Sequence, residues 1–130
     1  MDKQEINRRM AEEVMGWKRP EMGNEEQRNT GWVTDLPVKE NVIAESEWNP
    51  TEDLNQAMMG MEKLIARGCD DVELIYGSER VADGKWSAGF WYPGMDQKYS
   101  PRIGFVFDKS LPVAICLACL EAVEKMEKEN

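Results

Sequence analysis

Apolar residues recur at helical spacing near both ends of the chain. Four-residue steps from Ile6 to Val14 place apolar side chains along one face of a charged segment, which predicts an amphipathic helix over about residues 3–16. Residues 113–120 are apolar on nearly every side before a charged tail begins. We therefore expect a helix over about 111–127 whose first half is buried.

A third helical pattern lies between these two. Apolar residues recur from Leu54 until Gly68 stops the run, which predicts a helix over about 50–67. We expect Asn49 to cap this helix, with Pro50 in the first helical position, where a missing N–H costs nothing.

Alternating apolar and polar residues predict three strands, over about 71–76, 85–92 and 102–107. Ile75 and Trp91 lie on the faces opposite to the main apolar positions of their strands, so both sheet faces need cover. We therefore expect an α+β fold, a layered α/β/α sandwich. Its sheet is small and mostly antiparallel, with three to four strands and helices on both faces.

The polar segment 18–47 contains several Pro and Gly residues and is expected to be the least ordered region. Its one short apolar burst, Trp32-Val33, is compatible with an edge strand. The chain shows no internal repeat and no linker long enough to divide domains. Residues 1–130 are therefore expected to form a single domain.

The charge balance narrows the function. Sixteen Lys and Arg face 25 Asp and Glu, a net charge of −9, and His is absent. This balance disfavours a non-specific nucleic-acid binder, and the absence of His removes the commonest general base. Residues 31–60 hold six acids and one base, a net of −5. This acidic region is either solvated surface or a surface that docks on a partner protein.

The cysteines and the apolar runs indicate a compartment. The three Cys cannot form a closed disulfide framework, and the charged N-terminus does not look like a secretory signal, which fits a reducing cytoplasm. The longest uncharged apolar run, residues 111–120, is well short of the roughly 18 residues that span a bilayer, so no membrane association is expected. Cys116 and Cys119 are expected to be buried structural thiols, and no metal site or cofactor is expected.

Three segments carry a family resemblance. Ala11-Glu12-Glu13-Val14-Met15-Gly16-Trp17, Trp48-Asn49-Pro50-Thr51-Glu52-Asp53-Leu54 and Leu111-Pro112-Val113-Ala114-Ile115-Cys116-Leu117-Ala118 occur in this order. Together they resemble the phage ABA sandwich domain family of small phage and prophage proteins. The resemblance spans about residues 5–123, and this sequence departs from it by inserting a polar stretch between the first two motifs.

The resemblance implies helices that cover a sheet on both sides. It also implies a phage accessory protein in the cytoplasm of the infected bacterial host. By analogy of size and origin alone, some small phage proteins act as sponges, which are oligomers whose pockets capture nucleotide messengers of bacterial immunity.

Large aromatic residues are candidates for stacking on a nucleotide base, an interaction worth about 1–3 kcal/mol. Trp17 follows a helical stripe and Trp86 lies on an apolar strand face, so both are more readily explained as core. Trp48 and Trp91 are expected to be the more exposed aromatic residues.

A captured phosphate needs cationic or N–H donors. Lys98, Arg102 and Lys109 cluster near Ser110, where the last helix is expected to begin and to offer free N–H groups. Arg19, next to Lys18, belongs to a second and weaker basic pair. Ordinary solvated surface is the simpler explanation of both groups.

These observations lead to a hypothesis of binding without turnover. The chain is expected to be a phage-encoded, non-enzymatic homo-oligomer that sequesters a nucleotide-derived immune signal, such as a cyclic dinucleotide or an ADP-ribose derivative. The alternative is an inhibitor that docks on a host protein through its acidic residues 31–60. A nucleotide hydrolase is a third and weaker reading, since no metal site or general base is recognisable.

Overall fold

A computed structural model describes residues 1–21, 30–36, 41–69, 72–77, 85–91 and 102–129. The elements within these ranges follow in chain order. They are α1 (Lys3–Arg9), the π-helical turn η1 (Met10–Val14), β1 (Gly31–Val33), β2 (Val42–Ala44), the 3-10 turn η3 (Glu45–Glu47), α3 (Leu54–Ala66), β3 (Val72–Tyr76), β4 (Trp86–Trp91), β5 (Arg102–Asp108) and α4 (Leu111–Glu129).

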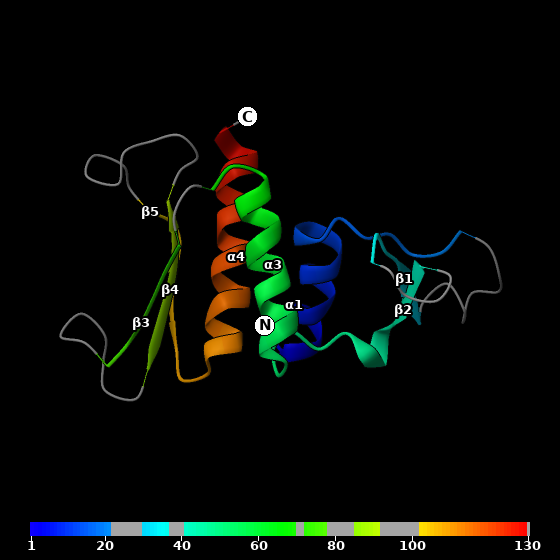
Figure 1. The fold of residues 1–130 in the computed structure, drawn as a ribbon, viewed down its shortest axis with the longest axis horizontal. Coiled ribbons are helices and arrows are strands. Elements are labelled where there is room, and N and C mark those ends of the chain that lie inside the picture. The colour runs from blue at the N-terminus through cyan, green and yellow to red at the C-terminus, as the bar shows by residue number, and fades with distance from the viewer. Residues whose placement is uncertain (22–29, 37–40, 70–71, 78–84, 92–101, 130) are drawn as a thin grey trace.

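The fold is α+β and layered, as expected. Strands β3, β4 and β5 form an antiparallel sheet in that order, and β1 and β2 form a separate antiparallel pair. Figure 1 shows the three-stranded sheet at one end of the molecule, α4 and α3 beside it, then α1, and the two-stranded sheet at the other end.

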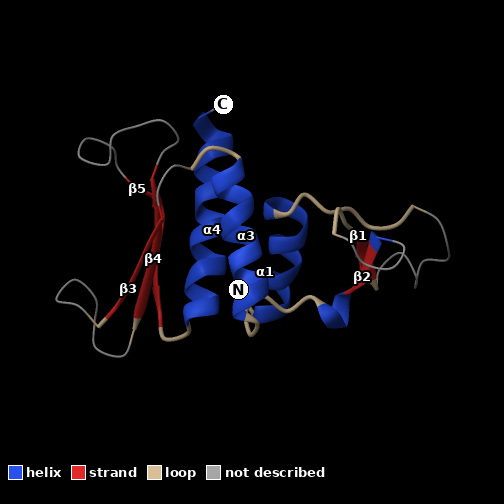
Figure 2. Ribbon diagram, in the orientation of Figure 1, coloured by secondary structure: helices blue, strands red, loops and turns tan. Residues whose placement is uncertain are grey.

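The order of the layers differs from the expected one, because the described helices all lie on one face of the three-stranded sheet (Figure 2). The cause is α4, whose apolar residues surround the helix instead of forming one stripe, so that it needs cover on two sides. The sheet covers one side of α4, and α3 and η1 cover another. The helices therefore occupy the middle of the molecule, and a sheet lies on either side of them.

The core is centred on this helix layer. Ala114, Ile115 and Cys119 of α4 are fully buried among residues of α3, η1 and β4. Gly60 of α3 permits the close approach to η1, because a Cβ atom at this position would collide with the end of the Met10 side chain. No helix among the described residues is long and apolar enough to cross a membrane.

The start of α3 corrects one prediction. Asp53, and not Asn49, caps the helix, because its side chain accepts a hydrogen bond from the Gln56 N–H at 3.1 Å. The helix therefore begins at Leu54, four residues later than expected. Asn49 is unavailable as a cap because its amide group is engaged by Asn7 of α1, 42 residues away in sequence.

Residues 48–51, which we call the Trp48 turn, are fastened to α1 by a hydrogen-bond network. The Trp48 indole Nε1 donates to the Asn7 carbonyl at 2.9 Å, and the Asn7 amide donates to Asn49 Oδ1 at 2.8 Å. The Thr51 N–H donates to Asn7 Oδ1 at 3.1 Å. The Trp48 ring also packs edge-on against Trp17, with 4.5 Å between ring centroids. The Trp48 turn thus joins α1 to the start of α3.

The polar segment 18–47 contains more regular structure than expected. The predicted edge strand at Trp32 is β1, and it pairs with the unpredicted β2, with Trp32 opposite Ile43. The pattern missed β2 because a strand of three residues is too short to show alternation. Close pairing at Gly31 requires the absence of a side chain, since a Cβ there would lie 2.6 Å from the Ile43 carbonyl oxygen.

The Trp48→Ala variant should lower the free energy of unfolding by about 3–5 kcal/mol, as expected for removal of a buried Trp side chain. It also leaves the Asn7 carbonyl without its donor. Urea denaturation measures the change. The matched control is Val42→Ala at an exposed strand position, which should change stability by less than about 0.5 kcal/mol. Equal stability losses in the two variants would refute a structural role for Trp48.

Candidate functional site

The structure buries the aromatic residues proposed for base stacking. Trp17, Trp48 and Trp91 are only 4%, 2% and 8% exposed. Trp17 is therefore a core residue, as its position in a helical stripe indicated. The expectation that Trp48 and Trp91 are exposed is wrong. Trp48 is buried because its indole N–H donates to the Asn7 carbonyl on α1 and its ring packs against Trp17. Trp91 is buried at the end of β4.

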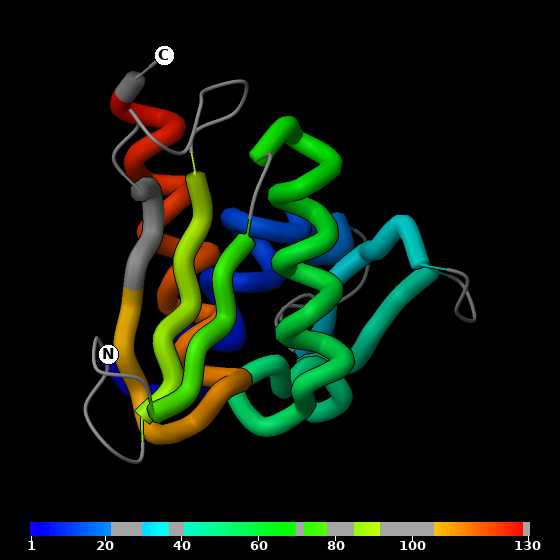
Figure 3. Tube along the Cα trace, turned by 60° about the vertical axis from the view of Figure 1, so that its left-hand side comes forward, coloured from blue at the N-terminus to red at the C-terminus, as the bar shows by residue number. Residues whose placement is uncertain are grey.

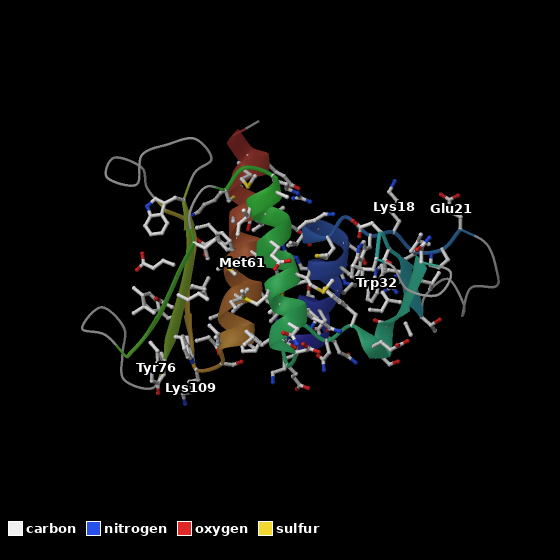
Figure 4. The ribbon with its side chains drawn as sticks, viewed as in Figure 1. Lys18, Glu21, Trp32, Met61, Tyr76 and Lys109 are labelled. Atoms are coloured by element: carbon white, nitrogen blue, oxygen red, sulfur yellow. The ribbon has the colours of Figure 1, made fainter. Side chains whose placement is uncertain are left out.

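Of the proposed basic cluster, the described residues Arg102 and Lys109 lie at the three-stranded sheet. Lys98 falls outside the described residues, and Arg102 begins β5, where its backbone pairs with Trp91. Lys109 is exposed beyond the end of β5. Figure 4 places Lys109 at the sheet end of the molecule and Trp32 on the other side of the helices. The structure therefore separates Lys109 from the part of the molecule that holds Trp32, whereas Arg102 and Trp91 are register partners in the sheet.

Ser110 caps α4 as expected, since its Oγ accepts a hydrogen bond from the Val113 N–H at 3.4 Å. The same helix start also carries a carboxylate, because Asp108 Oδ1 accepts from the Ser110 N–H at 2.9 Å. This negative charge opposes a bound phosphate at the N-terminus of α4.

Arg19 has a local structural role. Its guanidinium carbon lies 4.1 Å from the centre of the Trp32 ring, and its Nη1 donates to the Gly31 carbonyl at 3.1 Å. Its Nη2 lies 3.8 Å from Glu45 Oε1. The Arg19 side chain thereby stacks on the Trp32 ring and connects it to the backbone of β1 and to Glu45, which follows β2.

A cavity of about 500 Å³ opens beside these residues, and we call it the Trp32 cavity. It is enclosed by α1, the residue before β1, β1 itself, η3 and the Trp48 turn. Its lining residues are Gln4, Asn7, Arg8, Thr30, Trp32, Glu45, Ser46, Trp48 and Asn49. Buried indoles thus meet side-chain amides and hydroxyls in one open hollow.

Trp32 gives this cavity an unusual feature. The residue is fully buried, and its indole Nε1 has no hydrogen-bond partner among the described parts of the chain. A buried donor left unpaired costs about 1–3 kcal/mol. By contrast, the Trp48 indole N–H is paired with Asn7, and the Trp17 indole N–H donates to Asp35 at 3.2 Å. Trp32 therefore combines a place in the cavity lining with a buried donor that has no partner among the described residues.

The charges around the cavity nearly cancel. Arg8 contributes one cation, and its guanidinium lies 3.2 Å from Glu12 and 3.9 Å from Glu5 on its own helix. Glu45 contributes one anion and pairs with Arg19. The Trp32 cavity is thus suited to an uncharged, hydrogen-bonding group, with a single anionic group near Arg8.

A second, shallower hollow of about 370 Å³ lies near the end of η1. Lys63 Nζ donates to Asp35 Oδ2 at 2.9 Å, and the Trp17 indole donates to the other carboxylate oxygen. These hydrogen bonds, from Lys63 first and then Trp17, lower the pKa of the Asp35 carboxyl. The charged groups in this hollow already satisfy one another, so it is a poorer candidate for binding a ligand.

Several acids of the region 31–60 have local partners as well. Asp35 pairs with Lys63, Glu45 with Arg19, and Glu52 with Lys3 at 3.4 Å. Asp53 caps α3, and Glu40 falls outside the described residues. Local pairing therefore reduces the acidic field that docking on a basic protein would require.

The thiols are structural, as predicted. Cys69, Cys116 and Cys119 are free and buried. Burial raises the pKa of Cys116 to about 12 and also raises the pKa of Cys119, so neither forms a nucleophilic thiolate near neutral pH. Within the described ranges, no group of three or more Cys, Asp or Glu residues is arranged to hold a metal ion.

Comparisons with known proteins give a family and a fold. The family model described as Phage ABA sandwich domain matches residues 8–120. A solved structure, the 2.0 Å crystal structure of a phage protein from Bacillus cereus ATCC 14579, aligns over 94% of this chain and 92% of that chain. The TM-score is 0.61 at 18% sequence identity, so the likeness concerns the fold. No curated protein matches the chain.

Loss of the Asp35 carboxylate should change how stability depends on pH. The pKa of Asp35 is lowered in the folded state, so its contribution to stability is present at neutral pH. The contribution disappears as the pH falls below the ordinary Asp value of 3.8 and through the lowered pKa. The free energies of unfolding of the wild type and of Asp35→Asn should therefore differ at neutral pH and converge in acid. Urea denaturation across this range measures the difference.

The control for that experiment is Glu47→Gln. Glu47 is exposed on η3, and no ion pair joins it to another described residue. A difference in free energy of unfolding between wild type and Asp35→Asn that stays constant in acid would contradict the lowered pKa of Asp35. An equal effect of Glu47→Gln would contradict it as well.

Proposed function

This chain belongs to the phage ABA sandwich domain family, and we propose that it is a phage-encoded binding protein that holds a nucleotide-type ligand in the Trp32 cavity without cleaving it. In this proposal it acts in the cytoplasm of the infected bacterium. There it lowers the free concentration of a nucleotide-derived immune signal, such as a cyclic dinucleotide or an ADP-ribose derivative.

The unpaired Trp32 indole N–H is the observation that carries the proposal. Nucleobases present ring nitrogens and carbonyl oxygens at their edges, and these accept hydrogen bonds. A base that enters the cavity would pair the buried donor and meet the side-chain amides of Asn7 and Asn49. An unpaired buried N–H costs free energy, and a hydrogen bond to the ligand would recover it. Such a ligand is therefore favoured over a purely apolar one.

The size of the cavity supports a ligand of this class. Small-molecule sites typically enclose about 300–1,000 Å³, and the Trp32 cavity measures about 500 Å³. One base with its sugar fits this scale. Arg8 is the one cation among the lining residues, and a phosphate would compete with Glu12 and Glu5 for it, whereas Glu45 repels additional negative charge. The proposal therefore places the base inside and the phosphates toward Arg8 and the solvent.

Binding without turnover agrees with the available side chains. The chain has no His, and its three thiols are buried, with the pKa values of Cys116 and Cys119 raised by burial. Sequestration needs only affinity and enough binding sites, because mass action then keeps the free signal below the level that its effector detects.

Trp32→Phe should weaken ligand binding about tenfold, because it keeps an aromatic ring but removes the one N–H, worth about 1–1.5 kcal/mol. Arg8→Gln should weaken only ligands that carry phosphate. Calorimetric titration with cyclic dinucleotides and ADP-ribose derivatives measures both effects. The matched control is Trp91→Phe, the same substitution in a strand that does not line the cavity.

Heating the loaded protein should release the ligand unchanged, as chromatography of the supernatant would show. Recovery of a cleaved ligand would favour a hydrolase. Failure of the wild type to retain any member of the panel would overturn the nucleotide proposal. Equal losses of affinity in Trp32→Phe and Trp91→Phe would reject the Trp32 cavity as the site.

A further inference from the structure

Among the described residues, the three-stranded sheet has an open edge at β3. The strand order is β3-β4-β5, so β3 is paired on one side only among the described residues. Figure 3 shows β3 at the edge of the sheet, with β4 between it and β5. An open edge presents backbone N–H and C=O groups to which another strand can bind.

The ladder between β3 and β4 shows which backbone groups face outward. The Gly77 N–H donates to the Lys85 carbonyl at 3.3 Å, which makes these two residues a hydrogen-bonded pair. Hydrogen-bonded and non-hydrogen-bonded pairs alternate along an antiparallel ladder, so Ile75 also faces β4. The N–H and C=O groups of Val72, Leu74 and Tyr76 therefore point away from β4, into the open edge.

The side chains of these outward residues are apolar and only partly covered. Leu74 and Tyr76 are 37% and 56% exposed, and Figure 4 shows Tyr76 at the end of β3. The register places Leu74 opposite Ala88, a core residue, so these side chains lie on the sheet face that the helices cover. Because α4 packs over β4 and β5, this face is least covered at β3.

β3 lacks most of the features that protect edge strands in monomers. Such strands commonly carry Lys, Pro or a bulge. The β3 sequence Val-Glu-Leu-Ile-Tyr contains neither Lys nor Pro. The register shift described in this sheet lies between β4 and β5 and not in β3. Glu73 is the one charged residue of β3. The edge is therefore better suited to being covered than to remaining in water.

We propose that β3 of a second copy of this chain pairs with this edge, antiparallel and about a two-fold axis at Leu74. The two three-stranded sheets then form one continuous sheet. This interface does not depend on the proposed ligand site, which lies on the other side of the helix layer.

The strand is self-complementary in this register. Leu74 lies opposite Leu74 of the second copy, and Val72 lies opposite Tyr76. All three outward-facing residues thereby form hydrogen-bonded pairs and exchange both backbone hydrogen bonds. Glu73 lies opposite Ile75, so the two Glu73 carboxylates do not face each other. Like charges placed directly opposite would be unfavourable. This match favours a second copy over an unrelated strand.

The helix layer carries further exposed apolar side chains. The two-fold axis between antiparallel strands of one sheet is perpendicular to that sheet, so both helix layers stay on the same face. Leu54 and Ile65 of α3 belong to this layer and are 43% and 46% exposed. Their burial would supplement the backbone hydrogen bonds of a short strand pair.

Sedimentation equilibrium over a concentration series tests the dimer. The wild type should reach twice the 14.9 kDa mass of one chain. In Leu74→Lys, the two introduced cations would lie opposite each other across the two-fold axis, so this variant should remain at the mass of one chain. The matched control is Val42→Lys in β2, at a residue of similar exposure, 40%, and it should still dimerise. Circular dichroism establishes that both variants are folded.

Cysteine cross-linking tests the register and remains informative if Leu74→Lys fails to fold. Hydrogen-bonded pairs hold Cα atoms about 5.5 Å apart, within the roughly 4.4–6.8 Å range of disulfides. Oxidised Leu74→Cys should therefore form a covalent dimer, and Ile75→Cys, whose side chain points to the opposite face, should not. A wild type that stays monomeric throughout the series, a dimer that persists in Leu74→Lys, or cross-linking in Ile75→Cys alone would overturn the proposal.

Discussion

The hydrogen bond from the Trp48 indole to the Asn7 carbonyl is the contact on which the layout of the molecule depends. It joins the turn before α3 to the first helix, and edge-on packing against Trp17 keeps both rings out of water. The segment before this turn contains β2 and η3, so fixing Trp48 also positions the β1–β2 pair against α1. The Trp32 cavity is the space that this arrangement leaves between the helix, the strand and the turn.

The apolar character of α4 determines the other half of the fold. A helix that is apolar on most sides must be covered on most sides, and α4 accordingly packs against the sheet, α3 and η1. Its position over β4 and β5 leaves β3 less covered, with Leu74 and Tyr76 partly exposed. The two candidate interaction surfaces, the Trp32 cavity and the β3 edge, thus lie on opposite sides of the same helix layer, so a dimer through β3 leaves the cavity open.

Local patterns located the elements, whereas long-range contacts decided the site. Periodicity placed the helices and the three longer strands because burial repeats along an element. It failed at Asn49, whose capping side chain is engaged by Asn7, and at Trp48, whose acceptor lies 41 residues away. No local signal identifies Asn7 or Arg8 as cavity residues, since each looks like ordinary helix surface in sequence. Trp32 did stand out, as an apolar burst in a polar segment, but only the fold reveals that its N–H is unpaired.

The central claim is that a ligand occupies the Trp32 cavity and accepts the buried indole hydrogen bond. The indole N–H signals of the five Trp residues in a ¹H–¹⁵N correlation spectrum test it most directly, with the Trp32 signal assigned through its loss in Trp32→Phe. Titration with a nucleotide ligand should shift the Trp32 signal downfield as its N–H gains an acceptor and leave the Trp91 signal in place. Saturation of the protein with ligand while the Trp32 signal stays unmoved would contradict the account.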